Sequence, residues 1–304
     1  MPLLDNGVLP GPGAIAVRAV TAGAVMVGAA ASPALVSFIP GIGQLARLST
    51  SPLGSGPLGV AVMCAVSAVV CAVATVGAVR AVTVLTRTVD RGRRIDLGLR
   101  ADRRGLLWAA AMLLVALVIT GLTAGVLHLA GAQGPVADPM ASVPVELRTW
   151  PRLVAAVSLG FLLQGIPEEV VWRGWFYASA GSTRLAAAVS VLAFTVAHLA
   201  SSGGQQSWGQ RVVYLVMPLG LATAAMAARV VSGSLWPAIG VHGGLHLTND
   251  LLAHHLGVPR QPSTWVTVGL LWAVTGVVVL GLGRWRQKLR RTGHPRGTGP
   301  EVTG

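Results

Sequence analysis

The chain alternates long apolar runs with short segments rich in Gly, Pro or Arg. Runs such as 106–130 and 212–228 suit helices that cross a hydrocarbon core about 30 Å thick, which takes about 20 residues. Flanking Gly, Pro and Arg residues delimit eight such windows. They cover about 14–38, 58–84, 105–131, 152–178, 184–200, 211–231, 235–256 and 264–283. The pattern predicts an all-α fold, a polytopic membrane bundle of about eight transmembrane helices.

Composition leads to the same class of protein. Of the 304 residues, 53% are apolar and only 11% are charged, whereas soluble domains carry roughly 25% charged residues. So few charges cannot coat a soluble surface, and collagen, coiled-coil and disulfide-scaffold classes do not fit either. Cys64 and Cys71 are separated by about 10 Å along one helix, too far for a disulfide, so we expect packing residues.

The net charge of +13 is concentrated in blocks between apolar runs. One block spans Arg87–Arg104, and the other starts at Arg284 in the C-terminal tail. Basic blocks beside spans stay in the cytoplasm, so we expect a multi-pass protein of the cytoplasmic membrane with both termini inside. The bilayer is the expected partner and nucleic acid is not, because no basic face interleaved with aromatics is visible. The first window, with Arg18, could instead be a cleavable signal.

Three of the ten carboxylates fall inside the windows, namely Glu168, Glu169 and Asp250. An ionisable group in the bilayer costs a few kcal/mol and normally faces a cavity or a partner, so it is a functional candidate by default. The alternative is a structural ion pair with Arg173, which follows Glu169 by four residues in the favourable helical order. That pair would account for one glutamate and leave the other unpaired.

Histidines gather in the same half of the chain. His198 ends the fifth window, His242 and His246 lie four residues apart on the seventh, and Asn249 continues their stripe. A single intramembrane histidine is usually a helix contact. Three histidines together with a glutamate pair, on three windows, predict a water-filled cavity between helices, because polar groups at membrane depth need one.

Two chemistries suit this cluster. A buried glutamate can act as a general base towards water, with the imidazoles and the Asn249 amide stabilising the oxyanion. Alternatively, His242 and His246 have the spacing to share a zinc ion, completed by His198 or Glu168. No serine-nucleophile, P-loop or dinucleotide-binding motif is present.

The order of these motifs resembles the CPBP intramembrane proteases, which include the type II CAAX prenyl endopeptidases and bacterial Abi proteins. The resemblance covers roughly residues 145–256. Its three motifs are Glu168-Glu169-Val170-Val171-Trp172-Arg173-Gly174, Phe194-x-x-x-His198 and His242-x-x-x-His246, with Ser234-Leu235-Trp236-Pro237-Ala238 before the third.

The resemblance implies an all-helical membrane protease in which Glu168, His198 and His242 position the hydrolytic water, supported by Glu169 and Arg173. One departure lies at His246, where the family usually has Asn or Asp. That change could create a metal ligand, or Asn249 one turn later could supply the amide. The resemblance leaves the metal question open. We prefer a metal-free site, and zinc is the candidate cofactor if a metal is bound.

We therefore expect an intramembrane endopeptidase acting on membrane-associated peptides or proteins, with prenylated, CAAX-type ones as candidates. Residues 1–144 would form N-terminal helices with a basic loop, 145–256 the protease core, and 257–304 the last span and basic tail. The alternatives are a non-catalytic immunity or scaffold module of the same family and a proton-coupled transporter.

Overall fold

A computed structural model describes residues 10–38, 41, 56–138, 140–141 and 143–292, and within these ranges every regular element is helical. All eight predicted windows are helical, which confirms the fold class. The long uninterrupted helices are α1 (Pro12–Ser37), α3 (Pro57–Thr88), α4 (Arg103–Leu129), α10 (Val216–Ser232), α11 (Trp236–Leu256) and α12 (Pro262–Thr292). The loop predicted at 41–57 lies largely outside the described residues.

The fourth window is one continuous helical segment in which α-helical and π-helical turns alternate. After the short 3₁₀ turn η2 (Val145–Leu147), it runs through α5 (Thr149–Val157), η3 (Ser158–Gly165), α6 (Ile166–Glu169), η4 (Val170–Phe176) and α7 (Tyr177–Ser179), of which η3 and η4 are π-helical. Such turns are rare and occur frequently at functional sites.

The remaining helices are shorter. The fifth window forms α8 (Arg184–Ala197), which begins at the N-cap Thr183 and ends in the 3₁₀ turn η5 (His198–Ala200). The sixth window is divided at Leu215 into α9 (Trp208–Tyr214) and α10.

Six helices of the described chain are long and apolar enough to cross a membrane. These spans are 12–35, 57–88, 103–129, 149–179, 208–232 and 262–289. The fifth window forms a shorter apolar helix of residues 184–200. The helix of the seventh window, α11, is not among the six candidate spans. The protein is thus an integral membrane helix bundle, and apolar side chains such as Leu114, Leu192 and Val274 are exposed on its outside, as a lipid-facing surface requires.

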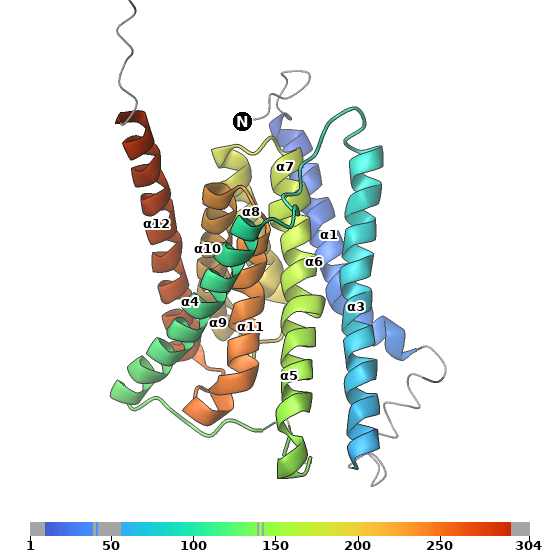
Figure 1. Cartoon of the computed structure of the whole chain (residues 1–304), viewed down its shortest axis with the longest axis vertical. Coiled ribbons are helices and arrows are strands. Elements are labelled where there is room, and N and C mark those ends of the chain that lie inside the picture. Colours follow the sequence, from blue (N-terminus) through green and yellow to red (C-terminus); the bar gives the residue numbers. More distant parts are fainter. Residues whose placement is uncertain (1–9, 39–40, 42–55, 139, 142, 293–304) are drawn as a thin grey trace, which may run out of the picture.

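The helices run alternately up and down. At the upper end in Figure 1, α1 begins, α3 ends, α4 begins and α12 ends. The basic segment between α3 and α4 therefore lies at the same end as the C-terminus of α12. This is the alternation that the basic blocks predict; the side of the membrane remains a separate prediction.

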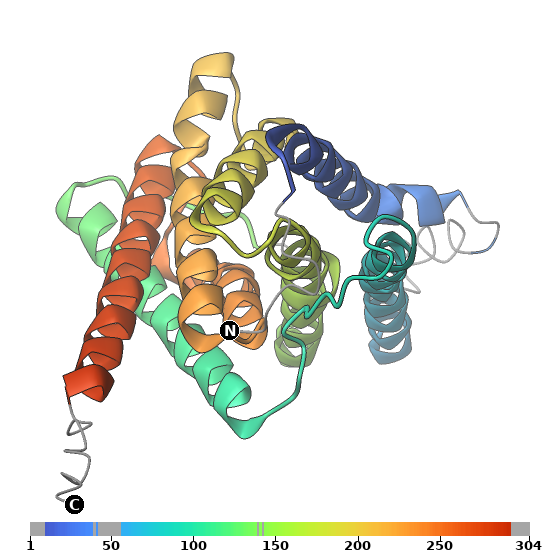
Figure 2. The ribbon, with the colours of Figure 1, turned by 90° about the horizontal axis from the view of Figure 1, so that it is seen from above.

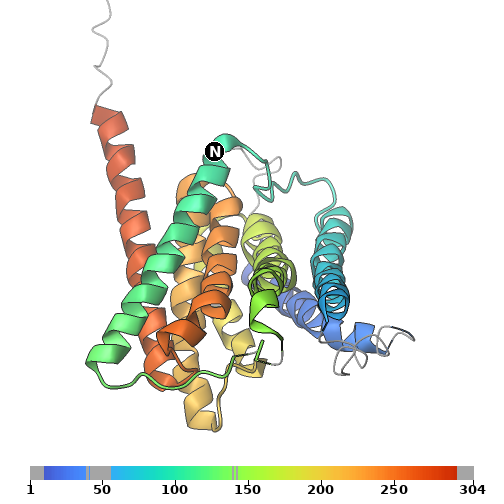
Figure 3. The same ribbon diagram turned by 60° about the horizontal axis from the view of Figure 1, so that its bottom comes forward.

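The interior of the bundle is organised around α11. It packs against α4, η3 and α10, and the view from above shows it enclosed by these elements, with α1 and α3 on the opposite side of the α5–α7 segment (Figure 2). Figure 3 shows α4 running beside α11. Glycines on α11 allow α4 and η3 to approach closely. A Cβ at Gly240 would lie 2.6 Å from the Ala109 carbonyl oxygen on α4, and a Cβ at Gly243 would overlap the Phe161 ring on η3. Small residues allow such contacts between membrane helices.

Cys64 is half-buried and Cys71 is buried, and both are free thiols. The expectation of two packing residues without a disulfide is confirmed.

Candidate active site

The two motif glutamates lie on α6, between the π-helical turns η3 and η4. Pro167 lies inside this continuous helical segment, directly after η3, where it lacks the backbone N–H that an interior residue would donate. The segment touches α11 closely at Gly165. A Cβ at Gly165 would lie 2.7 Å from the Gly160 carbonyl oxygen and 3.0 Å from the Gly243 nitrogen. The glutamates are thereby placed beside the histidine-bearing helix.

Glu169 is fully buried and its carboxylate joins two other elements. Its Oε1 accepts a hydrogen bond from Arg173 Nη1 at 3.0 Å and lies 2.9 Å from His242 Nδ1. Arg173 is itself fully buried. The ion pair expected from the four-residue spacing is therefore present, and the carboxylate also accepts from the third motif.

His242 contacts both glutamates from α11. While Nδ1 bonds to Glu169, Nε2 lies 3.9 Å from Glu168 Oε2. A carboxylate only accepts hydrogen bonds, so a neutral His242 beside ionised Glu169 carries its proton on Nδ1. The Nε2 lone pair then faces the Glu168 carboxyl group.

Glu168 is the glutamate that does not belong to the ion pair between Glu169 and Arg173. Its side chain is 8% exposed, and Oε2 is buried without a hydrogen-bond partner among the described residues. Burying such a group without a partner is costly. Glu169 Oε2 and two nitrogens of Arg173 are also buried without a partner among the described residues, but Glu169 is held through Oε1 by Arg173 and His242. The ion pair therefore explains Glu169 and leaves Glu168 unexplained.

His198 is the first residue of the 3₁₀ turn η5, directly after α8. The Phe194 ring lies between it and the other motifs. His198 Nδ1 lies 2.8 Å from the Phe194 carbonyl oxygen, so its neutral form is protonated on Nδ1. The buried Phe194 ring lies 4.4 Å from the His198 ring centroid and 5.8 Å from that of His242, with the Arg173 guanidinium 4.3 Å over its face. The three motifs therefore meet around Phe194, whose packing role the sequence did not indicate.

His246 and Asn249 are less closely connected. The His246 ring centroid lies 5.3 Å from that of His242, so the two histidines share a face as expected. Asn249 is half-buried and lies about 10 Å along the axis from His242, at 1.5 Å per residue. No contact joins its amide to the glutamates or histidines in the described chain, and Asp250 is likewise half-buried outside this network.

The zinc candidates His198, His242, His246 and Glu168 do not form a metal centre as placed. Within the described ranges, no group of three or more His, Cys, Asp or Glu side chains is arranged to hold a metal ion. The donor set therefore does not fit a bound zinc in this conformation, and the choice between the two chemistries stays a prediction for experiment.

Arg229, near the end of α10, is a further neighbour that the sequence analysis did not single out. Its Nε donates to the Arg173 carbonyl oxygen at 3.2 Å, and its guanidinium also bonds to the carbonyls of Asp96 and Gly233. It thus attaches η4 to the basic loop between α3 and α4. An arginine at the end of an apolar window is typical of a positive-inside residue, so no pattern in the sequence indicated this contact.

Residues 148–248, about a third of the chain, match the family described as type II CAAX prenyl endopeptidase Rce1-like. The match includes all three motifs and confirms the resemblance to CPBP and CAAX proteases. This family is one of peptidases, which supports peptidase activity in general. No curated protein and no solved structure matches the chain.

Proposed function

We propose that the protein is an intramembrane endopeptidase in which Glu168 activates a water molecule for attack on a peptide bond. The observation that carries this proposal is the enclosed Glu168 carboxyl group, which lacks a hydrogen-bond partner among the described residues and faces His242 Nε2 at 3.9 Å. A carboxylate beside an imidazole acceptor suits a general base, since both groups can accept hydrogen bonds from one water molecule.

The neighbouring residues hold this pair in place. Glu169 fixes the ring and the tautomer of His242 through Nδ1, and Arg173 balances the charge of Glu169. In the proposed mechanism, the carboxylate that reacts is therefore that of Glu168. In many active sites, a base is likewise oriented by a second group that does not itself react.

In the proposed reaction, the water donates one hydrogen bond to Glu168 and the other to His242 Nε2. Its oxygen forms a bond to the scissile carbonyl carbon while a proton passes to Glu168. The C–N bond then breaks, and that proton is transferred to the departing amine. His198 would help to position the water, as the resemblance implies. A contact of the Asn249 amide with the oxyanion would require the substrate to lie along α11, because Asn249 is two turns from His242.

We further propose that substrates are membrane-associated peptides or proteins, because the site lies among helices with a lipid-facing outer surface. The cytoplasmic membrane, with both termini inside, follows from the two basic blocks.

The proposal is tested with purified protein in proteoliposomes and a panel of membrane-anchored peptides, each prepared with and without a prenyl group. Products are analysed by mass spectrometry in ¹⁸O-labelled water, and we expect one labelled oxygen in the new carboxyl group. Cleavage of prenylated members alone would define a CAAX-type substrate. Intact peptides throughout would favour the non-catalytic module, and accumulation of a solute inside the vesicles would favour transport.

A further inference from the structure

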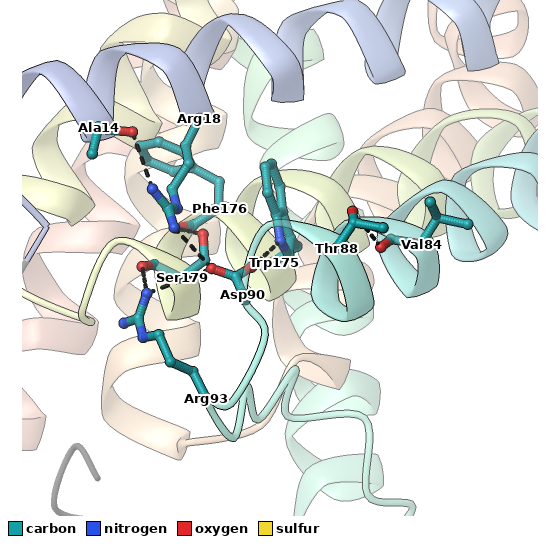
Figure 4. A network of polar contacts seen from close by, with 9 residues as sticks. All are labelled: Ala14, Arg18, Val84, Thr88, Asp90, Arg93, Trp175, Phe176 and Ser179. Carbon is teal, nitrogen blue, oxygen red and sulfur yellow. Dashed lines mark hydrogen bonds and ion pairs between the residues drawn. The ribbon is translucent and has the colours of Figure 1, made fainter. Parts of the chain in front are cut away.

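Asp90 is a buried carboxylate outside the proposed catalytic cluster. It lies two residues after α3, at the start of the basic loop, and is only 1% exposed. Figure 4 shows three side chains converging on it. Arg18 Nη2 lies 2.9 Å and Arg93 Nη1 3.5 Å from Oδ1, while Trp175 Nε1 donates to Oδ2 at 2.8 Å.

The two carboxylate oxygens of Asp90 therefore accept hydrogen bonds from different kinds of donor. Oδ1 accepts from the two arginines, which balance the charge of Asp90 inside the bundle. Oδ2 accepts from a neutral donor, the indole N–H of Trp175. The bond to Trp175 can thus be removed without changing the charge of any residue in the network.

Trp175 belongs to the segment that carries the site. It is fully buried in η4, two residues after Arg173, which bonds to Glu169, which in turn bonds to His242. Arg229 holds the Arg173 carbonyl on the same segment. Asp90 and Arg229 thus anchor η4 through groups from outside its own helix.

Arg93 strengthens the attachment at the following turn. Besides its ion pair with Asp90, its Nη1 donates to the Ser179 carbonyl oxygen at 2.9 Å, at the end of α7. The basic loop is therefore bonded to η4 through Trp175 and to α7 through Arg93 (Figure 4).

We propose that Asp90 is a positioning residue for the reaction, acting through its hydrogen bond to Trp175 to set the place of η4 and hence of Arg173 and Glu169. This inference rests on the proposed peptidase function. Asp90 touches neither substrate nor the reacting atoms. A displacement of about 1 Å in a catalytic group can cost about 100-fold in rate, so a single bond that fixes this segment controls kcat.

The decisive variant is Trp175→Phe, which removes the indole N–H and keeps an aromatic ring. Its matched control is Trp272→Phe on α12, because Trp272 is equally buried and its indole nitrogen has no partner among the described residues. For Trp175→Phe we expect kcat to fall about 10- to 100-fold with KM within about twofold of wild type, and amide exchange in residues 170–176 to accelerate. For Trp272→Phe we expect wild-type kcat and exchange in this segment.

A second pair of variants tests Asp90 itself. Asp90→Asn keeps one acceptor oxygen for Trp175 but removes the charge and places an NH2 group beside the two arginines, so we expect a kcat closer to wild type than that of Asp90→Leu and a lower unfolding temperature in detergent. Asp90→Leu removes the acceptor as well, so kcat should fall as in Trp175→Phe. If Trp175→Phe does not accumulate, this pair alone decides the question.

Equal kcat for Trp175→Phe and Trp272→Phe, or for Asp90→Asn and Asp90→Leu, would overturn the positioning role. Neither result affects the proposed function, which is tested separately by Glu168→Gln. Conversely, full activity of Glu168→Gln would refute the proposed base and leave the comparison of the Trp175 and Asp90 variants interpretable.

Discussion

His242 and Glu169, 73 residues apart in the sequence, share a hydrogen bond of 2.9 Å between Nδ1 and Oε1 inside the bundle. The bond joins the first motif to the third and fixes which imidazole nitrogen faces Glu168. In the proposed mechanism, Glu169 is thus an orienting residue and Glu168 is the general base. The same bond makes the site dependent on the charge balance of Glu169.

The first prediction concerns Arg173, which supplies that balance. Arg173→Ala leaves the buried Glu169 carboxylate without its cation, and breaking a buried pair in this way costs about 3–5 kcal/mol. We expect a lower unfolding temperature in detergent, lower folded yield and loss of activity. Arg103→Ala, at an exposed position in the first turn of α4, should behave as wild type. A wild-type unfolding temperature with lost activity would instead assign Arg173 to substrate contact.

His246 separates the two candidate chemistries. In the metal-free mechanism, His246→Asn restores the family's usual amide, so we expect the variant to keep much of the activity and chelators to leave the wild type active. In a zinc mechanism the same change removes a ligand, since Asn is a poor substitute for imidazole. Activity and metal content measured on the same preparations decide: about one zinc per chain, lost in His246→Asn, would contradict the metal-free mechanism.

Asp138, in the loop before η2, predicts a pH dependence of stability. Burial alone would raise the pKa of its carboxyl group, but hydrogen bonds from the Met140 backbone N–H and from Arg152 outweigh burial and lower the pKa below the usual 3.8. Because the folded-state pKa is lower than the unfolded one, the stabilisation is present above about pH 4 and is lost as pH falls through the folded value.

The measurement is the difference in unfolding temperature between wild type and Asp138→Asn across pH. We expect wild type to be more stable at pH 7 and the difference to shrink below about pH 4. A difference that does not vary with pH would show that Asp138 acts through packing alone.

Membrane orientation is tested with single cysteines in a Cys64→Ala, Cys71→Ala background. Arg91→Cys lies in the basic loop and Glu146→Cys in η2, directly before α5, and both positions are exposed. The α5 helix begins at the lower end in Figure 1, opposite the basic loop. With both termini in the cytoplasm, a membrane-impermeant maleimide should label Glu146→Cys in intact cells and Arg91→Cys only after lysis. The reverse pattern would overturn the orientation.

Hydrophobic patterning predicted the helices well because a span must be long and apolar whatever it packs against. Its eight windows correspond to eight helical segments. The pattern did not predict η3 and η4, since π-helical turns leave no mark on average hydropathy. Nor did it predict the break at Leu215, which lies within an apolar run.

Charged site residues could be predicted from the sequence where they lie in apolar windows, but not where they lie in the arginine-rich loop. Glu168 and Glu169 stood out as carboxylates in an apolar window. Asp90 did not, because it lies beside a run of arginines that reads as solvated loop, and its burial depends on Arg18 and Trp175 from distant parts of the chain. Tertiary packing decided its environment.

The most direct test of the account is the cleavage rate of Glu168→Gln. Glutamine has nearly the same shape but cannot accept a proton from water at neutral pH. Wild type, Glu168→Gln and the exposed control Glu146→Gln are compared at equal amounts of folded protein on one cleaved membrane peptide. We predict a rate at least about 100-fold lower for Glu168→Gln and a wild-type rate for Glu146→Gln. Equal rates for Glu168→Gln and wild type would contradict the assignment of Glu168 as the base.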